Sequence, residues 1–201
     1  MSDYLVGITG GIACGKSNLT AALKRIGVPV VDADAISHSL TGEKGEALPF
    51  LREAFGDGIF DGETLNRKRL GQIVFSDPEK RERLNALLHP MILRKMREEI
   101  DQTPGIVFMD VPLLFECGMD TWCNEVWCAY VPQKEQIARL RERDGITRKA
   151  ALQKIRVQMS GLEKARRADR VIRTDGSTEE SGRIVLSLYQ QLKERLAQYG
   201  T

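Results

Sequence analysis

The sequence predicts an α/β fold in which a parallel sheet of five strands lies between two helical layers, an αβα arrangement. Short apolar runs of strand length alternate with amphipathic segments of helical spacing along the 201 residues. This alternation is typical of βαβ units, whose right-handed crossovers make the strands parallel and cover both faces of the sheet. The length favours one domain with an insertion. A chain of this size buries about 70% of its unfolded surface, so it needs no disulfide or metal to fold.

The pattern begins with an apolar run, Tyr4–Thr9, which stops at two glycines and suits a buried strand. From Lys16, apolar residues recur at helical spacing as far as Gly27, and this predicts a helix. The remaining strands are predicted by four further apolar runs, at residues 28–32, 106–110, 126–131 and 170–173. A final helix is expected from Thr178 to about Tyr199, with an apolar stripe at i+4 spacing made of Ile184, Leu188, Leu192 and Leu196.

Residues 46–102 form a section that is too long for one crossover, so part of it is expected to form a helical lobe. Within this section, Asp77 is expected to cap a helix whose first residue is Pro78. Pro90 favours a break in the helical pattern, because helices often end before a proline.

The composition excludes several classes of protein. The 30 Lys and Arg residues nearly balance 28 Asp and Glu residues, and aromatic residues make up only 6%, which disfavours a nucleic-acid-binding protein. No apolar run approaches the ~18 residues of a membrane helix, and the amino terminus lacks the basic region of a signal peptide. We therefore expect a cytoplasmic protein with no membrane or nucleic-acid partner, and the oligomeric state is left open.

The four cysteines, Cys14, Cys117, Cys123 and Cys128, contain no CxxC pair. The two histidines, His38 and His89, both lie between Cys14 and Cys117 but at least 24 residues from either, so the usual ligand spacing of a zinc site is absent. Disulfides are rare in the cytosol. Buried or half-buried free thiols are therefore expected.

Residues 10–17 match the pattern GxxxxGK[ST], for which a chance match in this chain has a probability of roughly 0.01. The segment follows an apolar run and opens an amphipathic helix, as a phosphate-binding P-loop does. Lys16 is expected to contact the β- and γ-phosphates of a nucleotide, and the Ser17 hydroxyl to ligate Mg²⁺. The residues expected around the phosphates are Gly11, Ile12, Ala13, Cys14, Gly15, Lys16, Ser17 and Asn18.

Three acidic residues follow predicted strands. Asp32 and Asp34 point the same way if the strand stays extended, toward the crevice where α/β proteins bind ligands. One of them is interpreted as a catalytic base or a group that holds Mg²⁺ through water, and the other as a helix cap. Asp110 is either an acid that holds Mg²⁺ through water or a turn residue at the end of its strand. Glu116, a few residues further on, is either an acid on the substrate side or a solvated loop residue.

Arg139 and Arg143 lie four residues apart, so on a helix they share one face. Arginines supply planar, bidentate donors to the charge that develops on a transferred phosphoryl group. After a P-loop and a fourth strand, this pair is interpreted as part of a basic lid. His89 lies in an apolar context, where a structural histidine is the more frequent outcome.

These segments together resemble the dephospho-CoA kinase family, and the resemblance runs nearly end to end. The segments that carry it are residues 7–17, 31–34, 88–90, 110–116 and 136–144, with Gln158 and Ala168-Asp169. The resemblance implies ATP-dependent phosphorylation of the ribose 3′-hydroxyl of dephospho-CoA, the last step of coenzyme A biosynthesis. It implies ATP and dephospho-CoA as partners and Mg²⁺ as cofactor.

The same resemblance implies a single P-loop kinase domain in three parts. These are a nucleotide-binding core of about residues 1–45, 103–135 and 168–201, a helical CoA-binding lobe of about 46–102, and a lid of about 136–167. Lys16, Arg139 and Arg143 are implied as catalytic residues, with Asp34 as the base. The implied acceptor-side residues are Asp34, Leu88, His89, Pro90, Leu114 and Glu116.

The chain departs from the family pattern at two places. Asn18 stands where the family commonly has threonine, and little change is expected because Ser17 is the implied metal ligand. Residues 173–175 read Arg-Thr-Asp where many members carry an asparagine near the adenine. We name no adenine-contacting side chain there.

Two other functions share the P-loop. A kinase for nucleoside monophosphates or shikimate would not predict these segments in this order. A P-loop switch or binding protein is the other alternative, and a GTPase of that kind needs an NKxD motif, which the sequence lacks.

Overall fold

The computed structural model describes residues 2–199, without the side chain of Tyr199, and divides into two compact units. One unit comprises residues 1–31 and 103–201, and the other comprises the continuous stretch 32–102. In the part of the chain that is described, no helix is long and apolar enough to cross a membrane.

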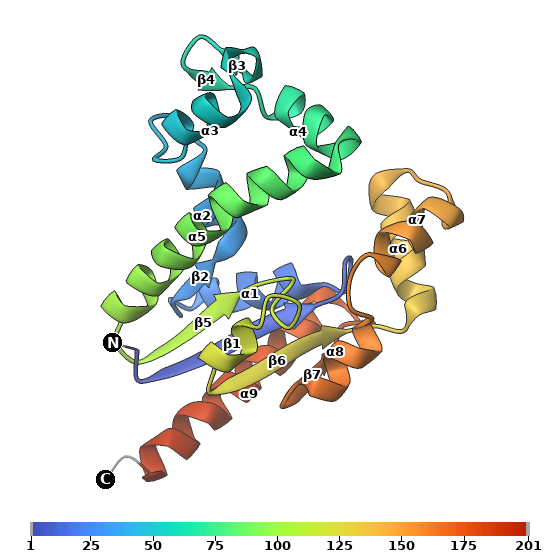
Figure 1. Ribbon diagram of the computed structural model, residues 1–201. Helices are drawn as coiled ribbons and strands as arrows, with labels where there is room; N and C mark the ends of the chain where they lie inside the picture. The colour runs from blue at the N-terminus through green and yellow to red at the C-terminus, as the bar shows by residue number, and fades with distance from the viewer. Residues whose placement is uncertain (1, 200–201) are drawn as a thin grey trace. The chain divides into compact units, whose positions relative to one another are not determined.

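The first unit contains the predicted parallel sheet, so the expected fold class is confirmed. Its strands are β1 (Tyr4–Gly10), β2 (Val30–Asp32), β5 (Ile106–Asp110), β6 (Glu125–Tyr130) and β7 (Arg170–Arg173), in the spatial order β2-β5-β1-β6-β7. The central strand, β1, pairs in parallel with β5 on one side and with β6 on the other (Figure 1). The carboxyl ends of these three strands therefore lie at one edge, where ligands of open α/β sheets bind.

Successive residues of β1 point to opposite faces of the sheet, and this alternation builds the layers. Val6 and Ile8 join a buried cluster with residues of α1 (Lys16–Arg25) and α9 (Thr178–Tyr199). On the other face, the Thr9 hydroxyl donates to the carbonyl of Pro112 at 3.1 Å. The helix α8 (Gly161–Arg167) packs on β1 and β6, and its Lys164 binds the same carbonyl. Helical layers thus cover both faces.

The last helix follows its predicted bounds, and three residues of the predicted stripe, Leu188, Leu192 and Leu196, pack into the core. The fourth, Ile184, is exposed, and Val185 is buried instead. Residues four apart advance by about 40° around a helix of 3.6 residues per turn, so one end of a strict i+4 stripe turns away from the sheet.

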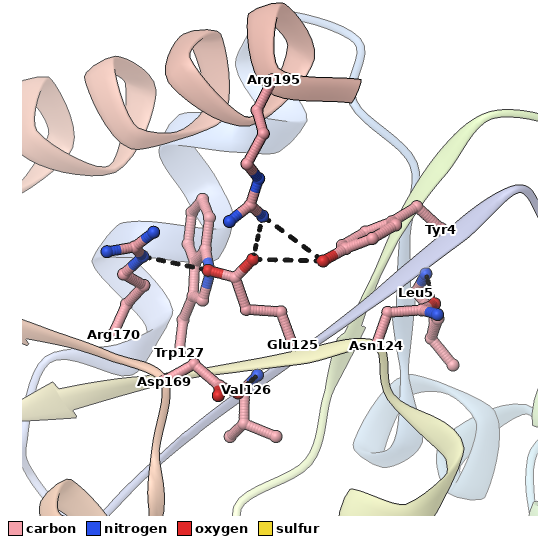
Figure 2. A network of polar contacts seen from close by, with 9 residues as sticks. All are labelled: Tyr4, Leu5, Asn124, Glu125, Val126, Trp127, Asp169, Arg170 and Arg195. Carbon is pink, nitrogen blue, oxygen red and sulfur yellow. Dashed lines mark hydrogen bonds and ion pairs between the residues drawn. The ribbon is translucent and has the colours of Figure 1, made fainter. Parts of the chain in front are cut away.

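A network around Glu125 fastens the amino end of β6 to the first and last elements of the chain. The Glu125 carboxylate accepts hydrogen bonds from the Trp127 indole at 2.9 Å, from Arg170 at 3.1 Å and from Arg195 of α9 (Figure 2). The Tyr4 hydroxyl of β1 donates to the same carboxylate at 3.3 Å. Burial by itself raises the pKa of Glu125, but the donors around it outweigh burial and hold the pKa below its usual value. Glu125 is therefore an anion buried among its partners.

The second unit consists of helices and one small hairpin. Its helices are α2 (Ala33–Leu40), α3 (Leu48–Phe55), α4 (Arg67–Ser76) and α5 (Pro78–Gln102), and α5 packs against the other three. A short 3₁₀ helix, Asp57–Ile59, leads into an antiparallel pair, β3 (Phe60–Asp61) and β4 (Thr64–Leu65), which the sequence analysis did not foresee. Gly62 opens the turn of this pair with a φ of 64°.

The helix α5 begins at Pro78 as predicted, and Asp77 accepts hydrogen bonds from the amides of Glu79 and Lys80 at 3.0 and 3.1 Å. It does not break at Pro90, so that expectation is wrong. Proline removes one backbone hydrogen bond from a helix. The packing of α5 against three helices compensates for this local cost.

Candidate active site

The P-loop lies where the sequence analysis placed it, between β1 and α1. Gly15 precedes the first residue of α1 with a φ of 75°, a left-handed conformation that side chains rarely adopt. A side chain on Gly10 would start 2.8 Å from the carbonyl oxygen of Ala129 in β6, so only glycine fits there. The amides that open α1 have no partner within the helix and bind anions readily. The loop is thus built to hold phosphate.

Lys16 and Asp110 form an ion pair at the carboxyl edge of the sheet. Lys16 is the first residue of α1 and Asp110 is the last residue of β5. The side chain of Lys16 is 16% exposed and that of Asp110 only 6%, so the pair is largely shielded from water. Asp110 holds the lysine ammonium beside the phosphate-binding loop.

Asp32 and Asp34 do not share an extended strand, because α2 begins directly after Asp32. One oxygen of the Asp32 carboxylate accepts hydrogen bonds from the amides of Asp34 and Ala35, both at 3.1 Å. Asp32 is therefore the helix cap, one of the two roles that the sequence analysis left open. The assumption that both carboxylates point the same way along a strand is wrong. Asp34 lies in the first turn of α2 and is exposed.

The two arginines of the predicted lid have different surroundings. Both lie on α6 (Gln133–Asp144), which packs with α7 (Arg148–Arg156). Arg139 donates to Glu135 at 3.0 Å and to the carbonyl of Thr174 at 2.6 Å. Its guanidinium also lies close to Gly15, 3.5 Å from where a Cβ would stand. Arg139 is therefore beside the P-loop in this structure.

Arg143 pairs with the neighbouring Asp144 at 2.8 Å, and Asp144 also contacts Lys154 at 2.7 Å. Hydrogen bonds from these two cations lower the pKa of Asp144 to about 2. The Arg143 side chain is 57% exposed.

Apart from Asp34 on α2, the expected acceptor-side residues lie on two segments. Leu88, His89 and Pro90 are part of α5 in the second unit, where His89 and Pro90 are exposed. Leu114 and Glu116 belong to the segment after β5 in the first unit. Leu114 is fully buried against Gly7 of β1, and Glu116 forms an ion pair with Lys164 of α8 at 2.9 Å. The roles of all five toward an acceptor stay predictions.

Three polar residues that the sequence analysis did not single out for a role contact the P-loop. Gln136 donates to the carbonyl of Ile12 at 2.7 Å, and Gln158 accepts from the amide of Ile12 at 3.2 Å. The Thr174 hydroxyl donates to the carbonyl of Cys14 at 2.6 Å. These contacts join residues 124 to 160 positions apart, so no local pattern announces them. The resemblance to the family included Gln136 and Gln158 but gave them no role.

The cysteines are free thiols in the described part of the chain, as expected, although Cys117 is exposed rather than buried. Burial raises the pKa of Cys14 in the P-loop, and it raises that of Cys128 to about 12. Both thiols therefore stay protonated near neutral pH and do not act as nucleophiles.

A pocket of about 200 Å³ beside Glu125 lies at the other end of the sheet. Its lining includes Arg170, Leu192 and Arg195. Glu125 is the first residue of β6, whereas the P-loop follows the last residue of β1, which runs parallel to it. This pocket is therefore separate from the phosphate-binding loop.

The ligands expected for Mg²⁺ are hard oxygen donors. Ser17 is an exposed residue in the first turn of α1, and Asp110 supplies a carboxylate at the same edge of the sheet. Mg²⁺ in phosphoryl-transfer enzymes uses only one or two protein side chains together with water and substrate phosphates. The donors present fit this ion.

Comparison with known proteins agrees with this geometry. The family model for dephospho-CoA kinase matches residues 4–180. The chain is 39% identical over 192 residues to a dephospho-CoA kinase of Geobacillus kaustophilus, covering 92% of this chain and 95% of the relative. It is 38% identical over 195 residues to one of Carboxydothermus hydrogenoformans, covering 94% of each.

Solved structures give the same result. A Thermus thermophilus protein superposes with a TM-score of 0.78 at 33% identity, covering 96% of this chain and 99% of that one. The dephospho-CoA kinase of Campylobacter jejuni superposes with a TM-score of 0.72 at 25% identity, covering 94% and 97%. A shikimate kinase of Acinetobacter baumannii shares only the fold, with a TM-score of 0.53 at 12% identity over 96% and 94% of the two chains. On the evidence of its P-loop, its sheet order and these relatives, the chain belongs to the dephospho-CoA kinase family.

Proposed function

We propose that this chain transfers the γ-phosphoryl group of ATP to the ribose 3′-hydroxyl of dephospho-CoA, releasing CoA and ADP. The observation that carries the proposal is the P-loop with Lys16 paired to Asp110, in a chain matched by the family model over residues 4–180. Phosphoryl transfer depends mostly on positioning and on stabilising charge, and this site offers amides, a lysine and an arginine for that purpose. No observation favours a kinase for another small acceptor or a nucleotide switch.

The roles that we propose for the residues are those that the resemblance to the family implies. Lys16 and the amides of the loop bind the phosphates, and Arg139 and Arg143 stabilise charge on the transferred group. Asp34 accepts the proton of the 3′-hydroxyl as that oxygen attacks phosphorus. The exposure of its carboxylate in the first turn of α2 supports this assignment.

Ser17 is the proposed protein ligand of Mg²⁺, with Asp110 acting through water. We prefer Asp110 to Asp32 because the latter uses a carboxylate oxygen to cap α2. The ion, when bound, neutralises negative charge on the β- and γ-phosphates.

We also propose that the second unit binds the acceptor. A pocket of about 270 Å³ within it is lined by Phe50, Leu87 and Met91 and by the ion-paired Glu46 and Arg94. A largely apolar pocket with a few polar groups in its lining is the usual form of a site for an organic ligand. The roles of Leu88, His89 and Pro90 toward this acceptor remain part of the proposal.

The reaction is tested by measuring ADP release with dephospho-CoA, AMP, shikimate or no acceptor. We expect release to require dephospho-CoA, at the 1–100 s⁻¹ that is roughly usual for kinases, and the product to carry a 3′-phosphate. Dominant ATP hydrolysis without an acceptor, or a preference for AMP or shikimate, contradicts the proposal.

Replacing either lid arginine by alanine is expected to lower activity more than stability. Arg143→Ala is expected to leave the free energy of unfolding within about 0.5 kcal/mol, because Arg143 is largely exposed and Lys154 still pairs with Asp144. Arg139→Ala is expected to cost about 1 kcal/mol, because it removes the hydrogen bond to Thr174. Both variants are expected to lose at least about tenfold in kcat, since each removes a charge-assisted donor to phosphate.

Arg141→Ala on the same helix is the matched control, because Arg141 is exposed and has no proposed role. Thermal unfolding and steady-state kinetics are measured on all three variants. If Arg139→Ala and Arg143→Ala lose no more activity than their loss of stability explains, the two arginines are structural.

A further inference from the structure

We propose that Gln136, Gln158 and Thr174 are positioning residues that hold the P-loop in its phosphate-binding conformation before the nucleotide arrives. The inference rests on the proposed nucleotide site but not on the identity of the acceptor. None of the three is assigned a contact with phosphate. Each acts through the backbone of Ile12 or Cys14.

The first observation is an unusual backbone between these two contact points. Ala13 has a φ of 59°, in the left-handed region that non-glycine residues seldom occupy. Such a conformation costs free energy and persists only when the surrounding structure holds it in place. Contacts with other parts of the chain must therefore hold Ala13 in this conformation.

The residues on both sides of Ala13 are fixed by hydrogen bonds from distant parts of the chain. Gln136 and Gln158 engage both polar groups of Ile12, the carbonyl at 2.7 Å and the amide at 3.2 Å. On the other side, Thr174 binds the carbonyl of Cys14 at 2.6 Å, and the Cys14 amide donates to the carbonyl of Gly11 at 3.1 Å. The peptide groups that flank Ala13 therefore have little freedom.

The three side chains come from three separate segments of the first unit, and each segment is itself anchored. Gln136 lies on α6 and is only 3% exposed. Thr174 directly follows β7 and is 2% exposed. Its carbonyl oxygen accepts a hydrogen bond from Arg139 at 2.6 Å. Gln158 stands next to Met159, whose amide donates to Glu116 at 2.9 Å.

Glu116 is in turn paired with the fully buried Lys164 at 2.9 Å. The segment after β5 and the helix α8 therefore fix the position of Gln158. Side chains anchored in this way can hold a loop more precisely than mobile surface groups.

These contacts have a consequence for binding. A loop that is ordered before binding does not lose conformational freedom when phosphate enters, so more of the contact energy appears as affinity. Loss of one of the three hydrogen bonds is expected to weaken ADP binding by about three- to tenfold.

The experiment measures ADP affinity by titration calorimetry for Gln136→Met, Gln158→Met and Thr174→Val, each in the natural chain and in an Ala13→Gly background. Methionine and valine keep approximately the size of the side chain and remove the hydrogen bond. Glycine adopts a positive φ without strain, so the loop of the Ala13→Gly chain depends less on the three contacts. We expect each loss of affinity to shrink to about twofold or less in that background.

Gln153→Met on α7 is the control for the substitution itself, because Gln153 is exposed and is not part of the loop contacts. Its ADP affinity is expected to match that of the natural chain. Thermal unfolding without ligand identifies any variant that fails to fold. Gln158→Met and Thr174→Val decide the question if the buried Gln136 does not tolerate methionine.

Equal losses in both backgrounds overturn the proposal, because the three residues would then act independently of the strained loop. Unchanged ADP affinity in the single variants overturns it as well. The titration contains no acceptor, so a chain that phosphorylates some other acceptor disproves the proposed reaction and leaves this result intact. A natural chain that binds neither ADP nor ATP overturns both.

Discussion

Lys16→Ala is expected to lower kcat at least about 100-fold while ADP and ATP still bind, because a preorganised cation stabilises the charge that develops during transfer more than the bound ground state. The structure adds a second effect. Asp110 is largely buried and loses its partner in this variant, so the free energy of unfolding falls by up to about 3–5 kcal/mol. Single-turnover rates are therefore measured well below the unfolding temperature of the variant.

Two controls separate the two effects of Lys16→Ala. Lys24→Ala changes an exposed lysine at the other end of α1 and is expected to alter neither rate nor stability appreciably. Lys16→Ala combined with Asp110→Asn removes the unpaired charge, so stability is expected to recover while the rate stays low. Asp110→Asn alone is measured beside it, because Asp110 also has a proposed role toward Mg²⁺. A variant with near-normal kcat and only a raised KM for ATP would show that Lys16 merely anchors the nucleotide.

Asp34→Asn is expected to slow phosphoryl transfer by about 10²–10⁴-fold, which is the range for loss of a general base. Asparagine keeps the shape of the side chain and its ability to form hydrogen bonds, but it cannot accept the proton of the 3′-hydroxyl. Because the Asp34 carboxylate is exposed, we expect stability and the binding of both substrates to stay almost unchanged. Single-turnover rates at saturating Mg²⁺ measure the effect.

Asp32→Asn is the matched comparison for Asp34→Asn. The Asp32 carboxylate caps α2 by accepting hydrogen bonds from the amides of Asp34 and Ala35. Asparagine caps helices about as well as aspartate, so we expect this variant to fold normally and to transfer phosphate at near the natural rate. If Asp32→Asn is inactive and Asp34→Asn transfers phosphate at the natural rate, Asp32 and not Asp34 is the base. If neither change slows transfer by about tenfold, no carboxylate base in this segment is needed.

The sequence predicted those parts of the fold that depend on local patterns. Apolar runs such as 106–110 indicated the strands, and the spacing of glycines before Lys16 indicated a P-loop at a strand-to-helix junction. Asp77 and Pro78 marked the start of α5 because capping chemistry acts within one turn. Each of these signals lies within a few residues of the structure that it predicts.

The errors arose where packing overrides local preference or where neighbouring residues adopt another backbone. Pro90 lies inside a helix that packs against three others. The strand β2 ends at Asp32, two residues before Asp34, so the two aspartates do not form an extended pair. The polar residues around the P-loop were missed for another reason. Nothing near Gln136, Gln158 or Thr174 in the sequence indicates that they meet Ile12 and Cys14, because the fold alone brings them together.

The Glu125 network has a consequence for the order in which the chain acquires its structure during synthesis. Tyr4 and Arg195, which meet at this carboxylate, are separated by 191 positions, so the first strand leaves the ribosome long before its partner exists. The second unit is continuous over residues 32–102 and can form its internal contacts as soon as that stretch emerges. The nucleotide-binding unit must wait for α9. The inserted unit is therefore complete while the unit that surrounds it in the sequence is still open, and a ribosome that stalls before residue 178 leaves the apolar face of β1 without the part of its cover that α9 supplies.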